Sequence, residues 1–202
     1  GSCTIDLWPE VSEYEKLYKT EFVFEDGSPA YTFSSYDAST VDTHFRWMEE
    51  YGIDGVFMQR FVAEIRNKSG KKHFSKVLDS AMESANRHSR AICIMYDLSG
   101  MNPGDENVLI ADIKELAERH SLFDHDSNPS YLYHNGKPLV TVWGVGFDDG
   151  RKYGYKEADK ILTALESMGF SIMLGVPTQW RTLDGDTIDD PVLHDLIRRC
   201  DI

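Results

Sequence analysis

The sequence alternates between segments with a helical spacing of apolar residues and short, nearly uncharged apolar runs. This alternation constrains the fold more than any other feature. The clearest run is Ala91–Met95, which carries no charge and shows little polar alternation. A strand that is covered on both faces in a parallel sheet has this composition. The more polar segment 96–100 follows at once, so the carboxylate of Asp97 is expected at the carboxyl end of a buried strand.

The same unit, a helix followed by a strand, is predicted five times from Asp37 onward. Helices are expected near 37–51, 74–85, 106–119, 158–165 and 190–199, and strands near 53–58, 91–95, 139–142 and 170–174, with residues 201–202 beginning another strand. Short connections between helices and buried strands are typical of right-handed parallel crossovers. Residues 1–36 show no such repeat, and we expect them to be irregular, with a short helix over 11–18 and a short strand at 31–33.

The predicted class is therefore α/β, of the (β/α) TIM-barrel type with mostly parallel strands. An eight-stranded barrel usually needs about 250 residues, whereas this chain has 202. We expect a truncated barrel, in which 1–36 is an irregular N-terminal segment and 37–202 is the repeat region, without the C-terminal strands. The alternative is a complete open sheet of the flavodoxin type, which 202 residues also accommodate.

Composition excludes several functional classes. A net charge of −13 without a basic stripe argues against nucleic-acid binding. No apolar stretch approaches the roughly 18 residues that span a membrane. The seven histidines form neither an HxH nor an HExxH motif, so neither a metal site nor a cofactor is expected. Small neutral ligands such as sugars remain compatible with an aromatic content of 12%.

Polar residues at predicted strand ends are the first candidates for a site. Asp97 can hydrogen-bond sugar hydroxyls, or it can cap the loop that follows it. Gln59 and Arg60 end the preceding strand, and their nitrogen donors suit hydroxyls or a carboxylate. Only one of these two can point inward, because strand side chains alternate. The alternative for both is a structural pair.

Aromatic residues near the strand ends are the second candidates. Trp143 ends the strand at 139–142, Trp180 lies in the loop after Pro177, and Tyr96 precedes Asp97. Indole and phenol rings pack against the apolar faces of sugar rings, although aromatic residues more often lie in the core. Both possibilities stay open for these three residues.

Three segments resemble the glycoside hydrolase family 71/99-like proteins. Segment 36–56 contains Gly-Ile-Asp-Gly before a strand, and resembles the helix, GIDG and strand of that family. Segment 78–97 is similar to the region in which its endomannosidases carry His-Ile-Glu-Pro-Tyr. Segment 128–140, with Asn-Pro-Ser-Tyr and Gly-Lys-Pro-Leu-Val, resembles the family's hairpin and strand. The resemblance covers roughly residues 36–180.

This resemblance implies metal-independent hydrolysis of glycosidic bonds in an oligo- or polysaccharide by a secreted or periplasmic protein. The family includes endo-acting α-mannosidases and bacterial proteins described as xylosidases or arabinosidases. Asp97 stands where the family has Glu, and Met95 replaces the preceding His. The carboxylates assigned to catalysis in endomannosidases lie on a later strand, outside this sequence. We therefore expect Asp97 to bind substrate rather than to supply a complete acid/base pair.

Two rival functions remain open at this point. One is a carbohydrate-binding protein that keeps sugar-facing residues without turnover. The other is a flavodoxin-like domain that binds a nucleotide or a flavin. Exposed sheet edges also predict self-association.

Overall fold

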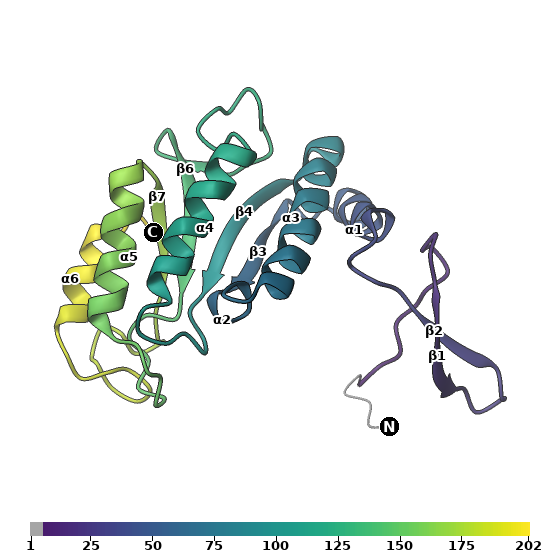
Figure 1. Ribbon diagram of the computed structural model, residues 1–202, viewed down its shortest axis with the longest axis horizontal. Coiled ribbons are helices and arrows are strands. Elements are labelled where there is room, and N and C mark those ends of the chain that lie inside the picture. Colours follow the sequence, from purple (N-terminus) through teal and green to yellow (C-terminus); the bar gives the residue numbers. More distant parts are fainter. Residues whose placement is uncertain (1–5) are drawn as a thin grey trace.

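The computed structural model describes residues 6–202. Its centre is a sheet in which four parallel strands lie in chain order (Figure 1). These strands are β3 (Gly55–Phe61), β4 (Ala91–Asp97), β6 (Lys137–Trp143) and β7 (Ser171–Gly175). The two-residue β5 (Tyr133–His134) pairs antiparallel with the start of β6. The parallel α/β class expected from the sequence is confirmed.

The helices lie between and after the strands. They are α1 (Ala38–Glu50), α2 (Val62–Ile65), α3 (Lys68–His88), α4 (Glu106–Arg119), α5 (Tyr155–Met168) and α6 (Val192–Arg199). Helix α5 ends at Met168, and Gly169, which follows it, has a φ of 92°, in the left-handed region that glycine adopts easily. No helix in residues 6–202 has both the length and the apolar character needed to cross a lipid bilayer.

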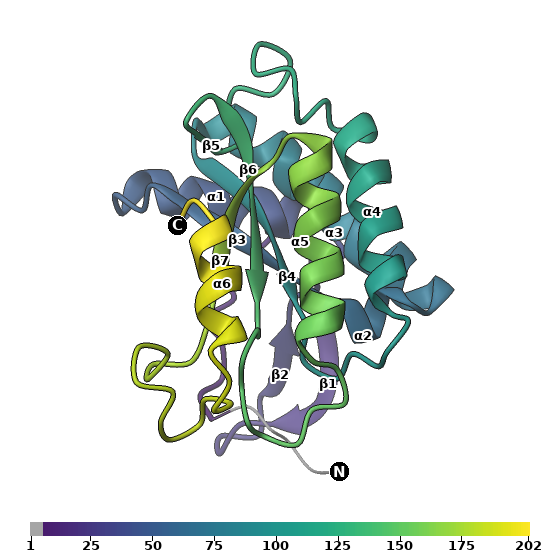
Figure 2. The same ribbon diagram turned by 90° about the vertical axis from the view of Figure 1, so that its left-hand side faces the viewer.

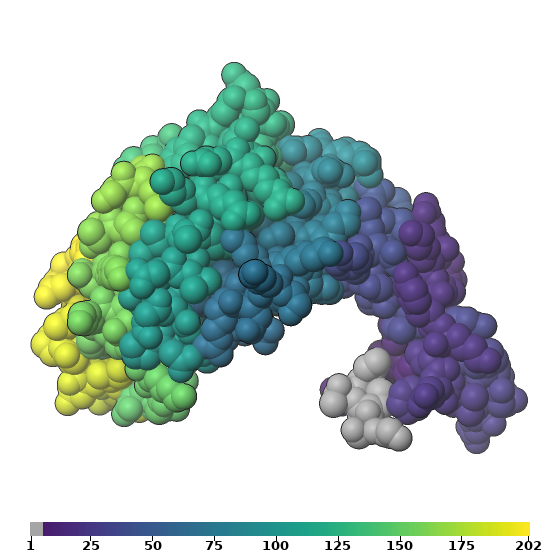
Figure 3. Space-filling model, viewed as in Figure 1, coloured from purple at the N-terminus to yellow at the C-terminus, as the bar shows by residue number. Residues whose placement is uncertain are grey.

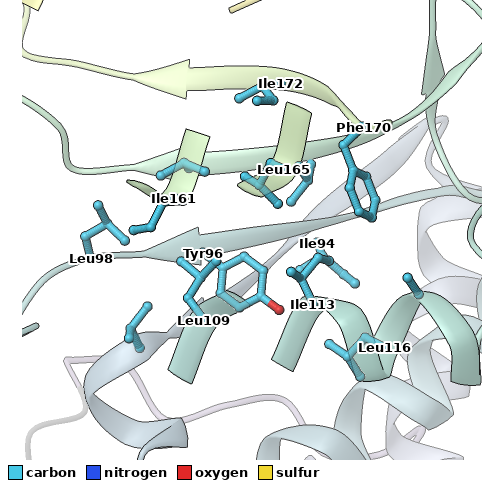
Figure 4. Close-up of a cluster of buried hydrophobic side chains, with 14 of the residues drawn as sticks. Ile94, Tyr96, Leu98, Leu109, Ile113, Leu116, Ile161, Leu165, Phe170 and Ile172 are labelled. Atoms are coloured by element: carbon cyan, nitrogen blue, oxygen red, sulfur yellow. The ribbon is translucent and has the colours of Figure 1, made fainter. Parts of the chain in front are cut away.

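The core lies between the sheet and the helices α3, α4 and α5, which cover the same side of the sheet (Figures 1 and 2). Ile94 and Tyr96 of β4 point toward Ile113 of α4, and the apolar residues of α5 complete the same cluster (Figure 4). Because strand side chains alternate, the residues between them face the other way. We call that other side of the sheet the open face; it carries Phe57, whose side chain is 42% exposed.

Strand order decides between the two folds that the sequence left open. A flavodoxin-like sheet reverses its strand order at a switch point and has helices on both faces. Here the order β3, β4, β6, β7 runs without reversal, and the helices α3 to α5 share one side. The flavodoxin-type alternative is therefore wrong.

The strands form an open curved sheet, since β3 and β7 each pair with a single neighbouring strand within the described residues. Residues 6–202 do not close into a barrel. Beside β7, the N–H of Ile202 donates to the carbonyl of Ile172, and the N–H of Leu174 donates to the carbonyl of Ile202. This is the hydrogen-bond pattern of a parallel pair, as predicted for residues 201–202.

The N-terminal segment agrees with its prediction only in part. The strand expected at 31–33 overlaps β2 (Pro29–Thr32), but no helix forms over 11–18, and β2 pairs antiparallel with β1 (Tyr18–Val23) in a hairpin. Tyr14 stacks on Phe33 with ring centroids 4.3 Å apart, and its hydroxyl lies 2.7 Å from Nε2 of His44 in α1. Tyr14 therefore connects Phe33, just after the hairpin, to α1, and it does not lie on a helix. The space-filling view shows the hairpin as one leg of an arch (Figure 3).

Candidate functional site

Asp97 lies at the carboxyl end of β4, with only 5% of its surface exposed. Its Oδ1 accepts a hydrogen bond from the backbone N–H of Ser99 at 2.8 Å, and its Oδ2 accepts one from Nε2 of Gln59 at 2.6 Å. The first contact closes a turn in the following loop, so the capping role considered for Asp97 is confirmed. Each carboxylate oxygen has two acceptor sites, and the two protein contacts leave a further site on each.

Gln59 is the member of the Gln59–Arg60 pair that shares a face with Asp97. It pairs in register with Met95, and the next residue of this face on β3, Phe61, pairs with Asp97. Its side chain is exposed, and its amide fixes one oxygen of the carboxylate. The two side chains therefore form a positioned hydrogen-bonding pair at the ends of neighbouring strands.

Trp143 extends this site onto the next strand. It pairs in register with Asp97 on one side and with Gly175 on the other, so all three positions belong to the open face. A Cβ atom at Gly175 would lie 3.3 Å from both Cβ and Cε3 of Trp143. The indole therefore lies against the bare backbone of Gly175 and remains half-buried. Its ring centroid is 4.7 Å from that of Phe147.

The loop after β6 completes the site. The carbonyl of Gly144 accepts hydrogen bonds from the Tyr153 hydroxyl, at 2.7 Å, and from the Arg151 guanidinium. That guanidinium lies 4.6 Å above the centroid of Phe147. Burial raises the pKa of Tyr153 to about 12, and the charge of Asp97 is among the smaller contributions. The Tyr153 hydroxyl is thus a permanent donor at neutral pH.

We call Gln59, Asp97, Trp143, Phe147, Arg151 and Tyr153 the strand-end cluster. Sequence reasoning missed its last three members, because they lie in the loop after Trp143 and not at the end of a predicted strand. The signal available was position, since loops at the carboxyl ends of parallel strands usually carry the ligand-binding residues.

Arg60 and Tyr96 lie away from this cluster, on the helix-covered side of the sheet. Arg60 donates to both oxygens of Asp112 in α4, from Nε at 2.7 Å and from Nη2 at 2.8 Å. The Tyr96 hydroxyl donates to the same carboxylate at 2.7 Å. Both residues were predicted to bind substrate, and the structure instead places them in a buried polar network. The reason is strand alternation, which sends Arg60 and Tyr96 to the face opposite Gln59 and Asp97.

Trp180 lies in the loop after β7. Its carbonyl is 2.8 Å from Nε2 of His194, and the guanidinium of Arg181 lies 4.5 Å from the centroid of its ring. Within residues 6–202 no hydrogen bond or aromatic contact joins Trp180 to the strand-end cluster. Its role in sugar binding stays a prediction.

The chemistry open to the cluster is limited by its charges. Glycoside hydrolysis generally uses two carboxylates that flank the scissile bond. On the open face of β3, β4, β6 and β7, Asp97 is the one carboxylate among the described residues. The described part of the chain also contains no group of three or more His, Cys, Asp or Glu side chains placed to hold a metal ion. The cluster offers hydrogen bonding and ring stacking rather than a complete acid/base pair.

Comparisons with known proteins add little to this geometry. No family model matches the chain, and no curated protein does. Among solved structures, it is similar to the GH99 endo-α-mannosidase from Bacteroides thetaiotaomicron in complex with bis-tris-propane, with a TM-score of 0.41 and 14% identity. The match covers 80% of this chain and 55% of that one, so this chain spans about half the length of the enzyme. Similarity at this level establishes neither a family nor a shared activity.

Proposed function

We propose that the strand-end cluster binds a carbohydrate and that this chain forms the substrate-binding part of a glycoside hydrolase-like protein. The observation that carries the proposal is the strand register, which brings the Asp97–Gln59 pair and Trp143 onto one face at neighbouring strand ends. Carboxylate and amide groups hydrogen-bond sugar hydroxyls, and an indole packs against the apolar face of a sugar ring. The resemblance of segments 36–56 and 128–140 to the family 71/99-like proteins supports the same substrate class.

Each residue has a distinct role in this proposal. Asp97 accepts a sugar hydroxyl through the acceptor sites that Gln59 and Ser99 leave free. Gln59 holds the carboxylate in one orientation. Trp143 supplies the stacking surface, which Gly175 supports from the next strand. Tyr153, protonated at neutral pH, keeps the loop that carries Phe147 in place.

A non-catalytic carbohydrate-binding protein is the second candidate. It is favoured by the single carboxylate on the open face, because hydrolysis needs a second one. A hydrolase of this kind would draw its second carboxylate from outside these four strands. A secreted or periplasmic location and self-association of the chain stay predictions.

A glycan array followed by calorimetric titration tests the proposal. We expect the purified protein to bind at least one oligosaccharide, and Asp97→Asn to weaken that binding by about 10- to 100-fold, since a hydrogen bond to a charged group contributes about 1.5–3 kcal/mol. Asp54→Asn is the matched control, because Asp54 is an exposed carboxylate just before the amino end of β3. Equal affinity of Asp97→Asn and wild type would refute the site.

Incubation of the bound oligosaccharide with the protein separates the two candidates. Release of shorter sugars supports a hydrolase. Binding without any product supports the non-catalytic protein.

A further inference from the structure

A pocket lies at the outer edge of β3, beside the strand-end cluster. The pocket, of about 240 Å³, opens between β3 and α3. Its lining includes Met58 and Arg60 of β3 and Phe74, Val77 and Leu78 of α3. This edge of β3 has no strand partner within residues 6–202. We call this cavity the edge pocket; Gln59 is the residue that it shares with the strand-end cluster.

Arg60 provides the edge pocket with a polar group that the protein does not use fully. The residue is only 2% exposed, and its Nε and Nη2 atoms are engaged by Asp112 and Ser75. Its remaining nitrogen, Nη1, donates to no acceptor in the described part of the chain. Arg60 lines the pocket, and since its Nε and Nη2 atoms are engaged by Asp112 and Ser75, Nη1 is the nitrogen left to donate to a ligand.

The rest of the lining is mostly apolar and suits one ring. Met58, Phe74 and Val77 are half-buried, and Leu78 is buried. An apolar cavity of about 150 Å³ holds a benzene molecule, and pockets for drug-sized ligands begin near 300 Å³. The edge pocket lies between these sizes. His73, at its border, is fixed by stacking on Tyr36 with ring centroids 5.5 Å apart.

Charges around the edge pocket favour an acceptor over a cation. Asp112 is already shared by Arg60, by the Tyr96 hydroxyl and, at 3.7 Å, by Lys71. The pocket lining itself contains no carboxylate. A ligand cation would therefore meet the Arg60 guanidinium without a counter-charge of its own.

We propose that the edge pocket binds a small monocyclic molecule that carries a carbonyl or carboxylate oxygen. The oxygen accepts a hydrogen bond from Nη1 of Arg60, and the ring packs between Met58, Phe74 and Val77. Apart from Gln59, the edge pocket shares no residue with the strand-end cluster, and the proposal does not depend on carbohydrate binding there.

Three probes of similar shape test the proposal: benzoate, benzamide and benzylammonium. Each is titrated into the isotope-labelled protein, and binding is followed through the NMR signals of the Val77 methyl groups and the Gln59 side-chain amide. We expect saturable shifts with benzoate and benzamide, and at least tenfold weaker binding of benzylammonium. Equal binding of all three probes, or no saturable shift with any, would overturn the proposal.

Substitutions locate the bound probe. Val77→Phe fills the pocket and is expected to weaken benzoate binding at least tenfold. Val108→Phe is the matched control, because Val108 is also half-buried at the edge of the core but belongs to α4 and does not line the pocket. Circular dichroism checks that both variants fold, and Val77→Leu replaces the first variant if it does not. Unchanged benzoate binding in the folded Val77 variant contradicts the proposal.

Discussion

The buried network around Asp112 gives the sharpest stability prediction. Asp112 is 1% exposed and accepts hydrogen bonds from Nε and Nη2 of Arg60 and from the Tyr96 hydroxyl, all within 2.8 Å. Asp112→Asn removes the charge but keeps the size of the side chain. It leaves the Arg60 guanidinium charged, 2% exposed and without a counter-ion.

The expected cost follows from this burial. Removing one partner of a buried ion pair destabilises a protein by about 3–5 kcal/mol, because the other charge is left uncompensated. A typical domain has about 5–15 kcal/mol of stability in total, so Asp112→Asn should remove a large part of it. Urea unfolding followed by circular dichroism measures the change in the free energy of unfolding.

Two comparisons make this test decisive. Replacing both residues by apolar ones, as in Arg60→Met with Asp112→Leu, should recover most of the loss, since no charge then remains buried. Glu50→Gln, which breaks the exposed pair with Arg46 one helical turn away, should cost only about 0.3–0.5 kcal/mol. The reasoning is refuted if Asp112→Asn costs less than about 1 kcal/mol, or if the double variant is no more stable than Asp112→Asn.

Three further predictions concern the cluster and the hairpin. Gly175→Ala should displace the Trp143 indole, whose Cβ and Cε3 lie 3.3 Å from the added methyl group, and should weaken glycan binding about tenfold, whereas unchanged affinity by calorimetry would separate Trp143 from the site. Because burial raises the pKa of Tyr153 to about 12, its protonated form is favoured in the folded state. The raised pKa contributes about 2–3 kcal/mol to the free energy of unfolding below pH 10, and this contribution is lost as the pH rises from 10 toward 12. The free energy of unfolding, measured with urea, should therefore fall more between pH 10 and 12 in wild type than in Tyr153→Phe. An equal fall in both proteins would contradict the role of Tyr153. Tyr14→Phe should cost about 1 kcal/mol by removing the hydrogen bond to His44, and should speed proteolysis within residues 6–36 while 37–202 stays resistant; equal cleavage rates would show that Tyr14 does not anchor the hairpin.

The repeat region was largely predictable because its signals are local. The run Ala91–Met95 is uncharged, and β4 includes all of it. Gly169 marked the end of a helix, and a positive φ is what that position requires. Each of these features depends on neighbouring residues alone, so periodicity and turn chemistry were sufficient.

The hairpin was predicted only in part: its second strand was expected, but a helix was predicted in place of the residues that lead into its first strand. Residues 26–29 carry turn residues, but the spacing of apolar residues over 11–18 favoured a helix before them. Tertiary contacts decided the outcome, since Tyr14 packs on Phe33 and His44. Contacts of this range are not visible in local periodicity.

Arg60 shows why the site was only partly predictable. Because strand side chains alternate, only one of Gln59 and Arg60 can share a face with Asp97, and that residue is Gln59. The partner that explains Arg60, Asp112, is 52 positions away in sequence. A polar residue at a strand end is therefore compatible with two faces, and a single sequence does not show which face meets a ligand.

The indole N–H signals of the four tryptophans test the central claim most directly. On titration with the oligosaccharide found by the array, the Trp143 signal should shift with saturation, together with the side-chain amide of Gln59. The Trp47 signal should stay in place, because its Nε1 donates to Glu13 and neither residue belongs to the strand-end cluster. A shift at Trp47 or Trp180 with none at Trp143 would contradict a carbohydrate site at the strand-end cluster.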